Sequence, residues 1–204
     1  MEKNYIRLPS FWGMETRHEH ISNHSSSLVV LFPGKNYSCD LPLLYYARSC
    51  AVECKHDVLS LEYGYQSART EHEEHDLPIV TKECLIAIQQ IADQYSNIIF
   101  VSKSMGTIIA GEIAKELGYD KIQHIYLTPL DQSVMYIQQS KGIVIYGTND
   151  PMFSEEQAKL IEAIGIRVVP IKNASHSLEV GHIFDSLEIL SSIIQIYFDF
   201  FQTK

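Results

Sequence analysis

Apolar runs rich in β-branched residues alternate along the chain with stretches whose apolar residues recur at helical spacing. Most of these runs are apolar throughout, a pattern typical of strands buried on both faces of a parallel sheet. They occupy residues 27–32, 57–61, 98–102, 121–127, 142–146 and 166–171. Helical spacing covers residues 41–54, 78–95, 105–117, 154–164 and 185–201. Two half-polar segments, 5–8 and 17–21, predict short strands at an edge of the sheet.

The alternation of strands and helices from Leu28 onward predicts an α/β protein with a mostly parallel sheet and helices on both faces. No internal repeat, low-complexity tract or linker interrupts it, so we expect residues 1–204 to form a single domain. Four apolar residues share one face of the final helix and are predicted to line the core: Leu187, Leu190, Ile194 and Phe198. Its further Ile and Phe residues leave a homodimer as one option.

The net charge and the cysteine content limit which binding partners and which cellular compartment we expect. The formal net charge is −9 and no basic stretch opposes it, which argues against a nucleic-acid partner. The N-terminus contains no apolar signal segment, and no apolar run is long enough to span a membrane. The cysteines at positions 39, 50, 54 and 84 have neither zinc-site nor redox spacing and predict reduced, mostly buried thiols. We therefore expect a cytoplasmic protein without a membrane span.

A sharp junction between a strand and a helix lies within residues 98–111. The apolar run ends in small residues, and the helical pattern that follows at once continues to Leu117. A strand that turns into a helix within about three residues presents its turn residue above the sheet. That residue is Ser104, with Ser102 two positions before it and Gly106 two after. The small neighbours predict a nucleophile elbow, although a serine at such a junction, taken alone, is more often a helix N-cap.

Two more reactive side chains follow later strands. Ligands of a parallel sheet bind beyond the carboxyl ends of its strands, and Asp150 and His176 lie there. A serine hydroxyl becomes a nucleophile when an imidazole takes its proton, and a carboxylate orients that imidazole. The order Ser104, Asp150, His176 therefore predicts a catalytic triad. Asp131, after the run 121–127, is a rival for the acid, and Asp150 could instead serve only as a turn residue before a proline.

With these residues the chain resembles the α/β-hydrolase superfamily over nearly its whole length. Members carry the nucleophile after the fifth strand, the acid after the seventh and the histidine after the eighth, positions that fall here on Ser104, Asp150 and His176. Segments 146–151 and 173–178 are similar to the acid and histidine loops of that superfamily. The resemblance implies an α/β-hydrolase fold of about eight strands. Its cap is minimal, because only residues 128–141, with a short helix near 132–138, separate the sixth and seventh strands.

Two positions depart from the pattern of the superfamily. Ser102 stands where the usual motif has its first glycine, and Pro33-Gly34-Lys35 replaces the common His-Gly pair after the third strand. By position, the backbone N–H groups of Lys35 and Met105 should form the oxyanion hole. Asn36 is the alternative to Lys35, one residue further along the loop.

The resemblance implies a serine hydrolase of the carboxylesterase or thioesterase type, which cleaves a small ester or thioester through an acyl-enzyme. Its partner would be a small-molecule acyl substrate, and it would need neither a cofactor nor a metal. Two alternatives remain open. The first is a catalytically silent binding protein on the same fold, and the second is an acyltransferase or peptidase that uses the same triad.

Other polar clusters favour interpretations without chemistry. His18, His20 and His24 lie close together, but no carboxylate or cysteine clearly converges on them, so we expect a solvated strand edge instead of a metal site. The charged run 69–76 does not match HExxH and predicts an exposed loop. Residues 34–36 lack the leading glycine and the Ser/Thr of a P-loop, which argues against nucleotide hydrolysis.

Overall fold

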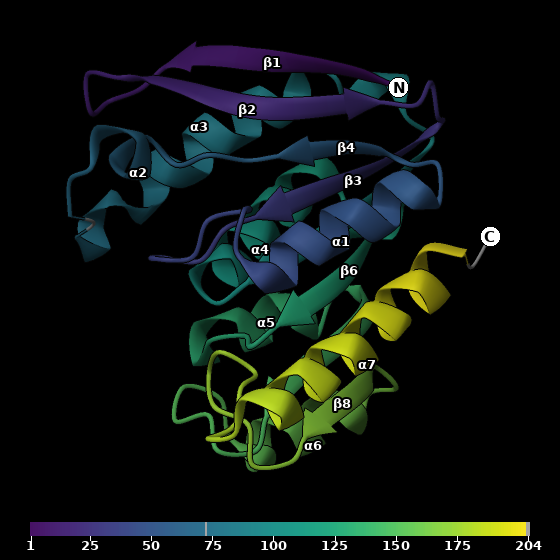
Figure 1. The fold of residues 1–204 in the computed structure, drawn as a ribbon. Coiled ribbons are helices and arrows are strands. Elements are labelled where there is room, and N and C mark those ends of the chain that lie inside the picture. Colours follow the sequence, from purple (N-terminus) through teal and green to yellow (C-terminus); the bar gives the residue numbers. More distant parts are fainter. Residues whose placement is uncertain (72, 203–204) are drawn as a thin grey trace.

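The computed structural model describes residues 1–71 and 73–202 (Figure 1). Its described residues form an eight-stranded sheet in the order β1-β2-β4-β3-β5-β6-β7-β8. The strands are β1 (Glu2–Pro9), β2 (Glu15–Ser22), β3 (Ser27–Phe32), β4 (Asp57–Ser60), β5 (Asn97–Lys103), β6 (Ile122–Leu127), β7 (Lys141–Gly147) and β8 (Arg167–Ile171). Strands β3 to β8 pair in parallel, whereas the hairpin β1–β2 joins β4 in antiparallel fashion. The prediction of a mostly parallel sheet is confirmed. Of the two strands expected at an edge, β1 lies there, whereas β2 pairs on both sides and is an inner strand.

Helices cover both faces of this sheet, as the alternation predicted. On one face lie α1 (Pro42–Glu53) and α7 (Ile183–Gln202), which Figure 1 shows side by side with the sheet behind them. The opposite face carries α3 (Leu77–Gln89) and α4 (Met105–Leu117). The shorter helices are α2 (Gly64–Ala68), α5 (Val134–Ile137) and α6 (Glu155–Glu162), and 3-10 turns occupy Glu74–Asp76, Ala92–Gln94, Tyr119–Lys121 and Asp131–Ser133. The helix expected over 78–95 is shorter than predicted. It is α3, which ends at Gln89, and the 3-10 turn Ala92–Gln94 follows it.

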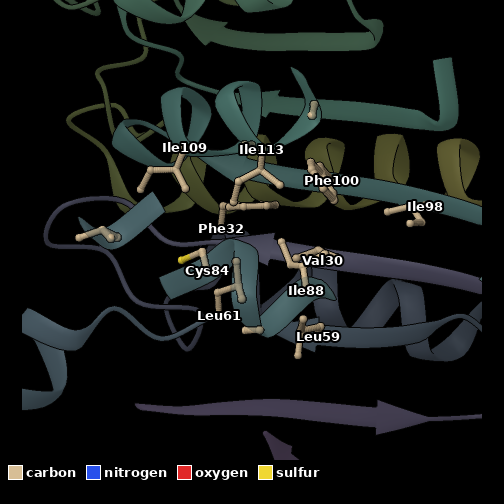
Figure 2. Close-up of a cluster of buried hydrophobic side chains, with 14 of the residues drawn as sticks. Val30, Phe32, Leu59, Leu61, Cys84, Ile88, Ile98, Phe100, Ile109 and Ile113 are labelled. Atoms are coloured by element: carbon tan, nitrogen blue, oxygen red, sulfur yellow. The ribbon is translucent and has the colours of Figure 1, made fainter. Parts of the chain in front are cut away.

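The continuous apolar strands supply a core on each side of the sheet. Alternate residues of one strand point to opposite faces, so Val30 and Phe32 face α3 and α4 while Val29 and Leu31 face α1 and α7. Figure 2 shows the first of these cores, where Cys84 and Ile88 of α3 meet Ile109 and Ile113 of α4. Burial on both faces explains why these strands show no polar alternation.

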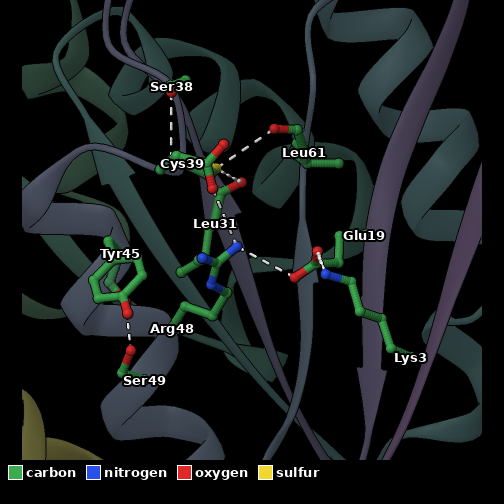
Figure 3. Close-up of polar contacts among 10 residues, drawn as sticks. Lys3, Glu19, Leu31, Ser38, Cys39, Tyr45, Arg48, Ser49 and Leu61 are labelled. Atoms are coloured by element: carbon green, nitrogen blue, oxygen red, sulfur yellow. Dashed lines mark hydrogen bonds and ion pairs between the residues drawn. The ribbon is translucent and has the colours of Figure 1, made fainter.

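Polar contacts fasten the antiparallel hairpin to the parallel part of the sheet. Glu19 of β2 forms ion pairs with Lys3 of β1 and with Arg48 of α1, the latter at 3.2 Å (Figure 3).

The thiol of Cys39 lies within hydrogen-bonding range of the carbonyl oxygens of Leu31 and Leu61. Cys39, Cys50 and Cys84 are buried and all four cysteines are free, as the spacing predicted.

Three expectations about burial were wrong or only partly right. The fully buried residues of α7 are Ile193, Tyr197 and Phe201. Of the four residues predicted to line the core, Leu190, Ile194 and Phe198 are partly buried and pack against it, whereas Leu187 is 51 % exposed. His18 is fully buried and not solvated, since β2 is an inner strand whose ring-bearing face is covered. In the segment 69–76, Arg69, Thr70, Glu71, Glu73 and His75 are exposed, as expected. Asp76 is buried and its carboxylate accepts the Glu73 N–H, and His72 lies outside the described residues.

No helix within residues 1–71 and 73–202 combines the length and the apolar character that a bilayer crossing requires.

Candidate active site

Three loops meet at the carboxyl edge of the sheet and bring together side chains that are far apart in the sequence. Ser104 follows β5, Asp150 follows β7 and His176 follows β8. His176 Nε2 lies 2.8 Å from Ser104 Oγ, and His176 Nδ1 lies 2.7 Å from Asp150 Oδ2. The imidazole thus connects the hydroxyl and the carboxylate in one chain of hydrogen bonds. This is the arrangement that activates a serine for nucleophilic attack.

The backbone at Ser104 has the conformation of a sharp strand-to-helix turn. Its φ of 53° and ψ of −121° are rare for a residue with a side chain and cost on the order of 1–3 kcal/mol. Gly106 permits this geometry, because a Cβ atom there would lie 2.4 Å from the carbonyl oxygen of Pro33. The Ser104 N–H donates to Leu127 O, and Thr107 Oγ1 donates to Ser104 O. The strained turn is therefore fastened to β6 on one side and to α4 on the other.

The loops that carry Asp150 and His176 are bonded to one another. The Asn149 N–H donates to Ala174 O at 3.0 Å, and the Asn173 N–H donates to Thr148 Oγ1 at 2.8 Å. Gly147 allows this close approach, since a Cβ atom there would lie 2.2 Å from Ala174 O. The acid and the histidine are consequently held together by hydrogen bonds between their loops, one between backbone groups and one to the Thr148 hydroxyl.

Burial differs sharply between the side chains of Asp150 and His176. The Asp150 carboxylate is fully buried and also accepts the Met152 N–H at 2.8 Å, whereas 26 % of the His176 side chain is exposed. Burial lowers the pKa of His176, and the positive charge of Lys103 lowers it further, while the hydrogen bond and the charge of Asp150 act in the opposite direction. The result is an imidazole that stays neutral below its ordinary titration range and is open to a ligand.

The loop after β3 packs against the start of α4. Residues 34–37 form a turn in which the Gly34 N–H donates to Tyr37 O. In the part of the chain that the structure describes, the N–H groups of Lys35 and Met105 have no hydrogen-bond partner. Backbone N–H groups without a partner are the kind of donor that an oxyanion hole needs.

Side chains from the segment around α2 hold this loop by its carbonyl groups. Tyr63 Oη donates to Pro33 O at 2.8 Å, and Tyr65 Oη donates to Lys35 O at 2.6 Å. Gln66 Nε2 donates to Gly34 O at 3.0 Å and to Lys35 O at 3.2 Å. With three carbonyl groups fixed in this way, the direction of the loop's N–H groups is fixed as well. Sequence reasoning missed these contacts, because nothing in a local pattern relates α2 to the loop after β3.

The alternative acid and the histidines considered for a metal site do not join the triad. Asp131 is exposed on its 3-10 turn, and His176 bonds to Asp150. His18 contacts Thr16 Oγ1 and the Glu62 N–H, and His20 contacts Tyr95 Oη. Within the described ranges, no three His, Cys, Asp or Glu side chains are grouped so that they could hold a metal ion.

Sequence reasoning also missed Lys103, between Ser102 and Ser104. This lysine is only 4 % exposed, and burial lowers its pKa to about 8. A charged residue at the end of an otherwise apolar strand was the available signal.

Comparison with known proteins supports the architecture through structure alone. No family model and no curated protein matches the sequence. Among solved structures, dienelactone hydrolase from Anabaena variabilis superposes with a TM-score of 0.75 at 16 % identity, over 98 % of this chain and 96 % of that one. Est1E from Butyrivibrio proteoclasticus, solved with ferulic acid, gives a TM-score of 0.71 at 13 % identity, with 96 % and 97 % covered.

A third similar structure is described as a serine hydrolase without lid, from Xanthomonas campestris. It gives a TM-score of 0.66 at 12 % identity, with 97 % of this chain and 95 % of that one covered. The coverage extends over nearly the whole of each chain, and the mostly parallel eight-stranded sheet with helices on both faces agrees with the expectation from sequence. This chain therefore has the α/β-hydrolase fold.

Proposed function

We propose that the protein is a serine hydrolase of the carboxylesterase or thioesterase type, with Ser104 as nucleophile, His176 as general base and Asp150 as the acid that orients it. The observation that carries the proposal is the pair of hydrogen bonds at 2.8 and 2.7 Å that join these side chains through the imidazole. The strained turn at Ser104 supports the same assignment, because functional sites are where such strain persists.

In the proposed reaction, Ser104 Oγ attacks the acyl carbon while His176 Nε2 accepts the hydroxyl proton. The resulting imidazolium is stabilised by the buried Asp150 carboxylate, and the N–H groups of Lys35 and Met105 bind the oxyanion. His176 then delivers its proton to the departing alcohol or thiol and leaves an acyl-serine. Water attacks this ester by the same steps in reverse and releases the acid. Each oxyanion donor contributes roughly 3 kcal/mol to transition-state stabilisation.

A short covering over the site favours small acyl groups. Between β6 and β7 the chain forms only a 3-10 turn and the four-residue helix α5, so no separate cap encloses a long chain. The net charge of −9 disfavours polyanionic substrates. We therefore propose small, uncharged or weakly charged esters or thioesters as the substrate class.

Labelling with a fluorophosphonate probe tests the nucleophile. We expect the wild type to be labelled and Ser104→Ala not to be, with ester hydrolysis lowered on the order of a millionfold, to background. Ser102→Ala is the matched control, because Ser102 Oγ is buried without a partner among the described residues. Labelling that persists unchanged in Ser104→Ala would contradict the assignment.

The same protein preparations separate the alternatives. A folded wild type that is neither labelled nor active on any ester or thioester would favour a catalytically silent binding protein. If labelling depends on Ser104, product analysis with added alcohols or amines distinguishes a hydrolase from an acyltransferase, and a peptide substrate reveals peptidase activity.

A further inference from the structure

Lys103 is a buried cation directly before the proposed nucleophile. It is 4 % exposed and closes β5 at the point where the chain enters the turn at Ser104. Within residues 1–71 and 73–202, its ammonium group forms no hydrogen bond and no ion pair. Buried ammonium groups are normally paired, so an unpaired one beside a reactive serine requires a reason.

The side chain of Lys103 lies under the loop that supplies the proposed oxyanion donor. A Cβ atom on Gly34 would come within 3.2 Å of Lys103 Cδ, so the aliphatic stem packs directly against this loop. Lys103 Nζ lies 5.0 Å from the ring centroid of Tyr37, a distance that allows a cation–π interaction. Ring and loop thus hold the ammonium group in place without neutralising its charge.

The charged and titratable groups that act on this ammonium come from separate elements. Asp150, on the loop after β7, attracts it, and it in turn repels a proton on His176, on the loop after β8. Tyr37 lies beneath it, and Glu179 acts on the Tyr37 phenol. His176 is therefore subject to two opposed charges, the carboxylate that it contacts and the buried ammonium.

We propose that Lys103 is a positioning residue of the site, whose buried ammonium group keeps the His176 imidazole neutral and so able to accept the Ser104 proton in mildly acidic solution. The proposal rests on the triad of the proposed function. A second positive charge on the imidazole is disfavoured by the charge of Lys103, which is held by the loop after β3 and the Tyr37 ring. Lys103 touches no reacting atom in this role and acts through His176.

Two separate titrations follow from this arrangement. His176 gains its proton only below its ordinary range, and Lys103 loses its proton as the pH rises through about 8, well below its ordinary value of 10.5. Between the two titrations the site holds a charged lysine and a neutral histidine. That combination is the state in which Ser104 can be deprotonated by His176.

NMR titration of the His176 ring tests the proposal without requiring turnover. The His176 signal is assigned by its loss in His176→Asn, and its pKa is compared in the wild type, Lys103→Met and Lys103→Gln. Both substitutions keep a chain of similar length and remove the charge, so either can serve if the other fails to fold. We expect the pKa of His176 to rise in each. Lys172→Met is the matched control, because Lys172 is an exposed lysine on the segment that leads to His176 and should leave the pKa unchanged.

The acid limb of kcat/KM provides the second readout. It should move to higher pH by the same amount as the NMR titration, and activity in acidic solution should fall about tenfold for each pH unit by which the limb moves. An unchanged or lowered pKa of His176 in a folded Lys103 variant would overturn the inference, even if Ser104 proves to be the nucleophile. If instead the pKa rises but the wild type shows no Ser104-dependent labelling, the proposed function fails and the electrostatic role of Lys103 stands.

Discussion

Single residues decide how closely the loops of the site can approach one another. Positions 147 and 106 are glycines for a steric reason, since a Cβ atom would lie 2.2 Å from a backbone oxygen at Gly147 and 2.4 Å from one at Gly106. A separation below 3.0 Å cannot be relieved by rotating a side chain when the neighbour is backbone. The distance between Asp150 and His176 therefore depends on a glycine outside the triad, whose carbonyl oxygen also accepts the Asp150 N–H at 3.0 Å.

Gly147→Ala tests this dependence. The new methyl group would meet Ala174 O at 2.2 Å and push apart the loops that carry the acid and the histidine. We expect a loss of stability of roughly 1–3 kcal/mol by overpacking and a fall in kcat/KM of at least about tenfold. Urea unfolding and ester hydrolysis measure the two effects. Gly181→Ala is the control, because no atom lies within 4 Å of its Cβ position; equal behaviour of the two variants would refute the argument.

At the scale of elements, the short helix α2 acts on the site through hydrogen bonds to the loop after β3. Tyr63 and Tyr65 are buried, and each donates its hydroxyl to a carbonyl of that loop. Because an amide group is planar, fixing a carbonyl also fixes the N–H group on the other side of the peptide bond. Gln66, which donates to Gly34 O at 3.0 Å, thereby orients the N–H group of Lys35, and Tyr65, which donates to Lys35 O, orients the N–H group of Asn36.

Tyr65→Phe tests this role of α2. The substitution keeps the ring and removes the donor to Lys35 O, which frees the peptide unit after Lys35 and loosens the loop that carries both Lys35 and Asn36. We therefore expect kcat to fall about tenfold, in line with about 1.5 kcal/mol for one hydrogen bond, while KM changes little. Fluorophosphonate labelling should slow in proportion. Tyr136→Phe removes a phenol bonded to Glu112 at 3.2 Å and should leave both rates unchanged. A normal kcat in Tyr65→Phe would show that the loop keeps its orientation without this bond.

Across the whole molecule, buried histidines make folding sensitive to acid. His124 in β6 is fully buried, stacks on Tyr126 and has no partner for either ring nitrogen within the described part of the chain. Burial lowers its pKa from 6.5 to about 3 and lowers that of His18 from 6.5 to about 4. Below pH 6.5 these two histidines bind protons in the unfolded chain but stay neutral in the folded chain. Stability is therefore lost as the pH falls from 6.5 toward these values.

The free energy of unfolding should consequently decrease below pH 6.5 by about 1.4 kcal/mol per pH unit for each of these two histidines. His124→Phe removes one titrating group and should reduce the slope by that amount between about pH 6 and about pH 4. Urea unfolding at a series of pH values measures the slope of the unfolding free energy against pH. His24→Gln, with a side chain that is 72 % exposed, should keep the slope of the wild type. An unaltered slope in His124→Phe would mean that the ring is not held neutral.

The sequence by itself determined the elements and their order, because periodicity and caps act over a few residues. The parallel strands, the helix from Met105 to Leu117 and the capping box of Ser154 and Gln157 all follow from such local patterns. The placement of Ser104, Asp150 and His176 in loops at the ends of strands could be predicted in the same way, because each comes shortly after an apolar strand.

Only the tertiary structure decided which side chains face inward and which loops touch. The buried face of α7 depends on where α1 packs, and the burial of His18 depends on β2 being an inner strand. The bond from Tyr65 to Lys35 O spans 30 residues, and the position of Lys103 under a loop from β3 joins segments still further apart. Such contacts depend on long-range packing, which a local pattern of apolar and polar residues does not encode.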